Sequence, residues 1–129
     1  MGWNILFYQK ENGEIPVKDF ITMQAPKMQA KIAWEIDLLS ERGLSLAMPH
    51  ARPLSGTDGL LELRIQAEGN ISRIFYVTYV NQTFVLLHGF AKKTEQIPKH
   101  ELEKAINNYA DFKRRFQHER AKGMERNQR

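Results

Sequence analysis

Three consecutive runs of strand character, in the middle of the chain, constrain the fold more than any other feature. Residues 61–65 alternate apolar and charged side chains, which is the pattern of a strand with one buried face. Residues 71–80 are rich in β-branched and aromatic side chains, and residues 83–90 form a third apolar run. Only the short turns 68–70 and 81–82 separate these runs. The sequence therefore predicts an antiparallel meander.

The flanking segments predict one further strand and three helices. Residues 3–9 are aromatic and branched and indicate a first strand. Pro16 and Pro26 each stand where a helix can begin, and Gly43 is a good helix stop, which together indicate a helical hairpin. Residues 44–58 have no hydrophobic period and are interpreted as a loop. Pro98 begins a last helix with an apolar stripe.

This order predicts an α+β fold with the sequence of elements β-α-α-β-β-β-α. We expect an antiparallel or mixed sheet of about four strands, with helices over one face and the other face at least partly open. Residues 1–116 would form the domain. Residues 117–129 carry no apolar face and are predicted to be a basic, frayed or disordered tail.

Composition excludes several functional classes. The 129 residues include no cysteine, so disulfides and thiolate metal sites are ruled out. The four histidines are widely spaced and form no ligand pair, so neither a metal nor another cofactor is expected. No apolar run approaches the length of a membrane span, and no basic segment precedes the apolar start, so a cytoplasmic protein without a membrane partner is expected.

The net charge of +4 is unevenly distributed along the chain. Residues 1–48 hold five Lys and Arg against six Asp and Glu, so the positive excess lies in the predicted sheet and the last helix. Such asymmetry fits a polyanion or an acidic protein partner.

Five candidate catalytic residues lie on or just after the predicted meander: Arg64, Arg73, His88, Lys92 and Lys93. Arg64 alternates with apolar neighbours and should point away from the core, where it could equally be a solvated arginine. Arg73 shares a face with apolar residues and must be paired, or extend its head group to solvent, or lie at a site. His88 has the parity of Phe84, Leu86 and Phe90, and it could equally be a core histidine with a satisfied hydrogen bond. The lysine pair could be a solubilising strand end.

Fixed positive charge beside an imidazole suits the binding and cleavage of a phosphodiester. RNA supplies its own nucleophile, the 2′-hydroxyl. The protein must orient that group, accept its proton, neutralise the phosphate and protonate the leaving 5′-oxygen. Arginine can hold two phosphate oxygens at once, and His88 has an ordinary pKa near neutrality. His88 or Lys92 is therefore the candidate for proton transfer.

Three strings of the meander resemble a known family. They are P-L-S-G-T-D-G-L-L-E-L-R, S-R-I-F-Y and L-L-H-G-F-A-K-K-T-E-Q-I-P, within residues 53–98. They are similar to the RelE/ParE toxin superfamily, and most similar to its phage-derived, HigB-like branch. The likeness in element order covers roughly residues 3–112, and H-G-F-A-K-K-T is its most diagnostic part.

The resemblance implies a RelE-like fold and a type II toxin that is neutralised by a cognate antitoxin, usually a small helix-turn-helix protein. It further implies ribosome-dependent, metal-independent cleavage of mRNA, and contact with operator DNA through the antitoxin complex. By position, Arg64 and Arg73 match basic residues of the family's strands. Lys92 and Lys93 match its basic pair, and His88 matches the histidine of the H-G-F string.

The chain departs from the family pattern at two places. The tyrosine that follows the basic pair in the classical pattern is absent from T-E-Q-I-P-K-H, although His100 lies nearby. Leu61 stands where an aromatic residue is usual, which leaves Phe75 and Tyr76 as stacking candidates, although both suit a sheet core better. Two alternatives stay open: a ParE-type inhibitor of DNA gyrase, and a non-catalytic protein that binds an antitoxin.

Overall fold

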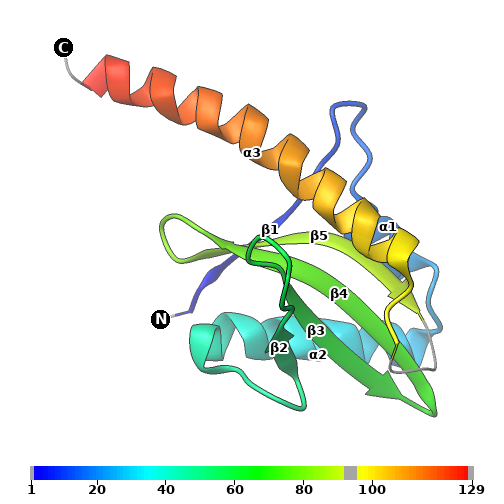
Figure 1. Ribbon diagram of the computed structural model, residues 1–129. Coiled ribbons are helices and arrows are strands. Elements are labelled where there is room, and N and C mark those ends of the chain that lie inside the picture. The colour runs from blue at the N-terminus through cyan, green and yellow to red at the C-terminus, as the bar shows by residue number, and fades with distance from the viewer. Residues whose placement is uncertain (1, 92–95, 128–129) are drawn as a thin grey trace.

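The computed structural model describes residues 2–91 and 96–127, with side chains described as far as residue 116. One mixed sheet of five strands, in the order β1-β5-β4-β3-β2, forms the centre of the molecule (Figure 1). The elements are β1 (Asn4–Phe7), α1 (Pro16–Thr22), α2 (Pro26–Arg42), the 3-10 helix η1 (Gly43–Ser45), β2 (Ala51–Pro53), β3 (Leu61–Ala67), β4 (Asn70–Tyr79), β5 (Thr83–Ala91) and α3 (Lys99–Asn127).

The predicted meander is confirmed, and the α+β class with it. Strands β3, β4 and β5 pair antiparallel in consecutive order, and β1 pairs in parallel with the far side of β5. The sheet has five strands where about four were predicted, because β2 lies within the segment 44–58 that was interpreted as a loop. Strand β2 has only three residues, which is too short for an alternating pattern. It is a strand because it pairs with β3.

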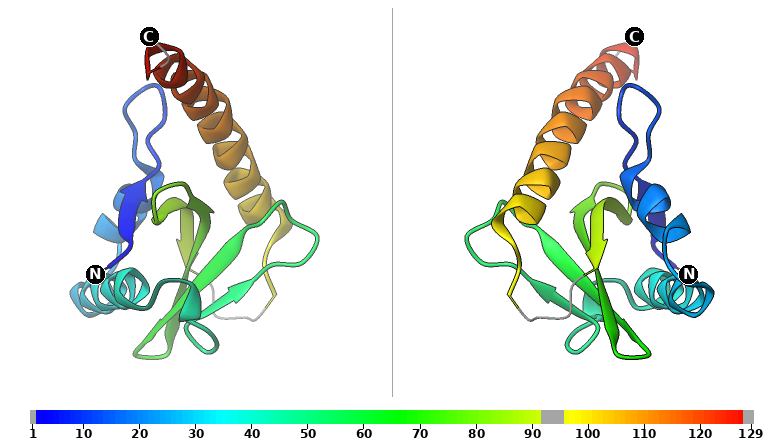
Figure 2. Two further views of the ribbon diagram at one scale, coloured as in Figure 1. Left: turned by 90° about the vertical axis from the view of Figure 1, so that its left-hand side faces the viewer. Right: turned by 90° about the vertical axis from the view of Figure 1, so that its right-hand side faces the viewer.

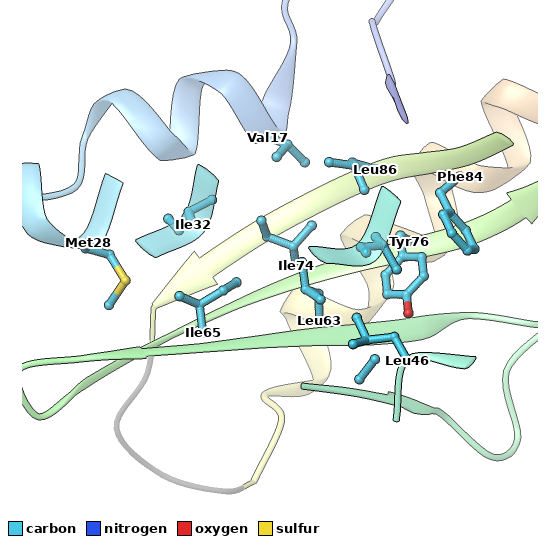
Figure 3. Packing of buried hydrophobic residues seen from close by; sticks show 12 residues of the cluster. Val17, Met28, Ile32, Leu46, Leu63, Ile65, Ile74, Tyr76, Phe84 and Leu86 are labelled. Carbon is cyan, nitrogen blue, oxygen red and sulfur yellow. The ribbon is translucent and has the colours of Figure 1, made fainter. Parts of the chain in front are cut away.

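Helices cover both faces of the sheet (Figure 2). The first face packs against α1 and α2. Figure 3 shows its core, in which Val17 and Ile32 from the two helices meet Ile74 and Leu86 from the strands. The opposite face packs against α3, through Ala105 and Phe112. The prediction of helices over one face is therefore wrong, because α3 packs on the second face, where its apolar stripe needs a partner as much as the strands do.

Helix α3 is longer than the sequence predicts. Its backbone stays helical from Lys99 to Asn127, through most of the segment expected to fray, and in Figure 1 its C-terminal part extends beyond the sheet. The division into a domain of residues 1–116 and a tail of residues 117–129 stays a prediction.

No helix in the described part of the chain has both the length and the apolar character needed to cross a bilayer.

Candidate functional site

A β-bulge in β5 decides where His88 points. Phe75 of β4 lies opposite His88, whereas the next residue, Tyr76, lies opposite Leu86, so Leu87 is an extra residue in β5. Such an insertion reverses the alternation of the strand beyond it. His88 consequently shares the α3 face with Phe75, and the prediction that it shares a face with Phe84 and Leu86 is wrong. Both of those residues belong to the core under α1 and α2.

His88 pairs with a carboxylate from the first turn of α3. Its Nε2 lies 3.3 Å from Glu101 Oε1, and each side chain is 13% exposed. Because a carboxylate only accepts hydrogen bonds, Nε2–H is the donor, and in the neutral ring Nδ1 then carries the lone pair. Among the described residues, Glu101 is the only hydrogen-bond partner of the imidazole.

The surroundings of His88 favour a neutral ring. Burial lowers the pKa of His88 below its ordinary value of 6.5, while Glu101 opposes that shift and the positive charges of Lys104 and Lys10 reinforce it. A neutral, oriented imidazole is the form that can accept a proton.

A pocket of about 400 Å³ opens beside this pair. Three segments far apart in sequence form it: the end of β5, the chain from just after β1 to the first residue of α1, and the N-terminal half of α3. Its walls are Lys10, Pro16, His88, Gly89, Lys104, Asn107 and Asn108. Asn108 is held in place because its side-chain amide donates to the carbonyl oxygen of Leu87 at 2.8 Å. No carboxylate lines the described walls of this pocket.

The two candidate arginines lie on the same sheet face as His88. Arg64 and Arg73 are directly opposite each other on β3 and β4, which places like charges side by side. Arg73 is fully buried, and its Nη1 donates to Glu62 Oε1 at 3.0 Å. Glu62 also accepts from Arg52 Nε at 3.1 Å. The buried carboxylate of Glu62 thus offsets the charge of Arg73.

The arginines and His88 do not converge on one point. Arg64 is two strands from β5, roughly 10 Å at the usual strand spacing. The rings of Phe75 and Phe90 occupy the sheet positions between them, 5.3 Å apart. Arg64 is half-buried and Arg73 is fully buried, so in this conformation Arg73 presents no surface to a substrate.

Lys92 and Lys93 lie outside the described residues, and their part in the site stays a prediction. The stacking candidates Phe75 and Tyr76 are both buried, which agrees with their interpretation as core residues. Among the described residues, no group of three His, Asp or Glu side chains gathers where it could hold a metal ion.

Sequence reasoning missed three residues of this site: Glu101, Lys10 and Lys104. The first turn of a helix favours an acidic residue through the helix dipole, so Glu101 carried a signal that the helix start at Pro98 could have revealed. Lys104 and Asn108 are four residues apart, and their position on one face of the last helix could have been read from the sequence. Lys10 had no such signal, because only the parallel pairing of β1 brings it beside β5.

The fold and the site define an α+β protein with a histidine–carboxylate pair at a pocket lined by cationic and amide groups. Such a site can bind an anionic group and move a proton at it. A family model, described as phage-derived protein Gp49-like (DUF891), matches residues 19–110. The chain belongs to this family, which is of the RelE-like toxin type. A comparison with curated proteins found no match.

Proposed function

We propose that the chain is the toxin of a type II toxin–antitoxin pair and inhibits translation by cutting mRNA in the ribosome without a metal ion. The observation that carries this proposal is the pairing of His88 with Glu101 at the wall of a cation-lined pocket. Membership of the Gp49-like family supports a toxin-like protein. The HigB-like branch, a cytoplasmic location, a helix-turn-helix antitoxin and contact with operator DNA through that antitoxin belong to the same proposal.

In the proposed reaction His88 is the general base. Its Nδ1 accepts the proton of a ribose 2′-hydroxyl while the 2′-oxygen attacks the adjacent phosphorus. The bond from phosphorus to the 5′-oxygen breaks, which leaves a 2′,3′-cyclic phosphate on one fragment. The departing 5′-oxygen takes a proton from an acid, for which Lys92 is the candidate, and becomes a hydroxyl. No metal is needed, because the nucleophile comes from the RNA itself.

Glu101 is a positioning residue in this scheme. It accepts from Nε2–H, so the imidazole keeps the tautomer in which Nδ1 is the base. It also stabilises the imidazolium that forms when the proton is taken.

Arg73 has a supporting role in this proposal. Its buried guanidinium holds Glu62 and thereby the α3 face of β3 and β4. Arg64, which is half-buried on the same face, is the arginine better placed to contact a phosphate group of the bound RNA.

The test adds purified protein to a translating system and maps the 5′ ends of the mRNA. We expect cuts in codon register that are absent without ribosomes. His88→Gln should reduce them by roughly 100-fold or more, the usual contribution of a general base. The matched control is His50→Gln. His50 also pairs with a carboxylate, Glu35 at 3.1 Å, but it is not among the residues that line the pocket.

Intact mRNA with a folded wild-type protein would reject the nuclease and favour a gyrase inhibitor, which a supercoiling assay detects, or a purely antitoxin-binding role. Equal loss of cutting in the His50 and His88 variants would reject His88 as the general base, because the effect would then be one of stability rather than of chemistry.

A further inference from the structure

The walls of the pocket beside His88 carry hydrogen-bond donors from two of the segments that form it, the chain after β1 and α3. Two are lysine ammonium groups, Lys10 and Lys104, and two are the amides of Asn107 and Asn108. On α3 these residues occupy positions 104, 107 and 108, a spacing of three and four that puts them on one helix face. The pocket volume of about 400 Å³ falls within the range of roughly 300–1,000 Å³ of small-ligand sites.

Both lysines have only weak partners. Lys10 Nζ lies 3.7 Å from Glu14, and both side chains are about half exposed. Lys104 Nζ lies 3.6 Å from Glu101, a carboxylate that His88 also uses. Both distances are long for an ion pair and both lysine side chains are substantially exposed, so these pairs contribute little to stability and an incoming anion can compete for both ammonium groups.

The lysines also act on the site electrostatically. Each contributes to the lowered pKa of His88, which means that their charge is felt at the imidazole. Because Lys10, Lys104 and His88 line the same pocket, an anion bound there would lie next to the ring.

We propose that Lys10, Lys104 and Asn107 form a subsite for a phosphate group of single-stranded RNA, next to the ribose on which His88 acts. This inference rests on the proposed function for the identity of the polyanion. It adds a binding role for three residues from the segment after β1 and from α3, none of which belongs to the meander. An acidic peptide is the less suitable occupant, because a peptide carboxylate would have no use for the oriented imidazole in the same pocket.

The experiment uses the His88→Gln protein, which keeps the pocket but is not expected to cleave RNA. A 15N-labelled sample is titrated with inorganic phosphate, with a short single-stranded oligoribonucleotide and with a glutamate peptide of equal charge. We expect the side-chain amide signals of Asn107 and Asn108 to shift with the oligonucleotide, and more weakly with inorganic phosphate. Lys10→Gln combined with Lys104→Gln should weaken the apparent Kd for the oligonucleotide by roughly tenfold, the loss expected when a charge-assisted contact is removed.

The matched control is Lys27→Gln. Lys27 is an exposed lysine paired with a glutamate, Glu68 at 2.7 Å, and it lies outside the pocket walls. It should leave the Kd unchanged. Removal of a phosphate contact should also reduce the dependence of log Kd on log salt by about 0.7 per contact, which Lys27→Gln should not do.

Three results would overturn the subsite. One is the absence of shifts at Asn107 and Asn108; another is an unchanged Kd in the double lysine variant. The third is tighter binding of the glutamate peptide than of RNA, which would make the pocket a docking site for an acidic protein segment. Failure of the proposed function is a separate result: wild-type protein that binds RNA here but leaves translated mRNA intact would retain the subsite and reject the nuclease.

Discussion

Arg73 and Glu62 form an ion pair with a 3.0 Å contact, in which neither side chain is more than 1% exposed. A buried carboxylate that loses its partner is left with an uncompensated charge, so Arg73→Ala should lower the free energy of unfolding by about 3–5 kcal/mol. Urea unfolding followed by circular dichroism measures this loss. Arg52→Ala is the matched control, because Arg52 binds the same carboxylate from a side chain that is 37% exposed. It should cost no more than about 1 kcal/mol.

This prediction affects how activity data on Arg73 are interpreted. A loss of the proposed activity in Arg73→Ala would follow from destabilisation alone, so it would be no evidence for a catalytic arginine. Equal stability losses in the Arg73 and Arg52 variants would contradict the buried pair and return Arg73 to the list of substrate contacts.

The pKa of His88 should respond in opposite directions to its neighbours. Glu101→Gln should lower the pKa further, because it removes the negative charge that favours the imidazolium. Lys104→Gln should raise it, because it removes a positive charge that opposes protonation. NMR titration of the His88 ring protons measures both changes. Shifts of the same sign in the two variants would mean that the ring does not lie between these groups.

The same pKa links His88 to the pH dependence of stability. His88 binds a proton less readily in the folded chain than in the unfolded chain, where the pKa of His88 stays near 6.5. The stability present above pH 6.5 is therefore lost as the pH falls from 6.5 towards the folded-state pKa. His88→Gln should flatten the urea-midpoint profile in that window, and an unchanged profile would assign the acid sensitivity to other groups.

Much of the fold was predictable because its main part is local in sequence. The meander was marked by alternation in residues 61–65 and by two short turns, and hairpin pairing follows directly from such turns. The strand β2 was not predictable, since its three residues form a strand only through pairing with β3. The packing of α3 on the second face depends on the path of the chain between β5 and α3, and no local sequence pattern predicts that path.

Of the predicted site residues within the described part of the chain, only His88 lines the pocket, and its geometry was not predictable. His88 was identified, but its face was predicted wrongly because β5 is buried on both sides. Alternation is invisible in such a strand, and an inserted Leu87 leaves no mark in the pattern. Glu101 could have been foreseen as an acidic residue in a first turn, but its contact with His88 depends on the position of α3. The apolar neighbours of Arg73 left three possibilities open, namely pairing, extension to solvent or a place at a site, and the structure shows pairing with Glu62.

Tyr8 connects the end of β1 to α3. Its hydroxyl donates to Asp111 Oδ2 at 2.6 Å, and burial together with this bond raises the pKa of Tyr8 to about 12. Tyr8→Phe should lower the free energy of unfolding by about 1.5–3 kcal/mol, the cost of losing a hydrogen bond to a charged group. The stability that Tyr8 adds should be lost as the pH rises from 10 to about 12, because the unfolded chain releases the proton first.

Ultraviolet titration of the phenol groups tests this assignment. Burial alone raises the pKa of Tyr76 to about 12, so wild-type protein should show at least two late-ionising tyrosines and Tyr8→Phe one fewer. If the variant has as many late-ionising tyrosines as the wild-type protein, Tyr8 is exposed to solvent. The hydrogen bond from Tyr8 to Asp111 of α3 is then absent.

Gly89 lets α1 pack against the strand that carries His88. A Cβ at this position would lie 2.6 Å from Cδ2 of Phe20, closer than any stable contact. Gly89→Ala should therefore cost about 1–3 kcal/mol through overpacking. Phe20→Ala removes the clash, so the double variant should be more stable than the sum of the two single losses predicts. Urea unfolding of all four proteins measures this coupling. Additive losses would mean that the Phe20 ring moves aside freely, and then the bulge and Glu101 alone would fix the position of His88.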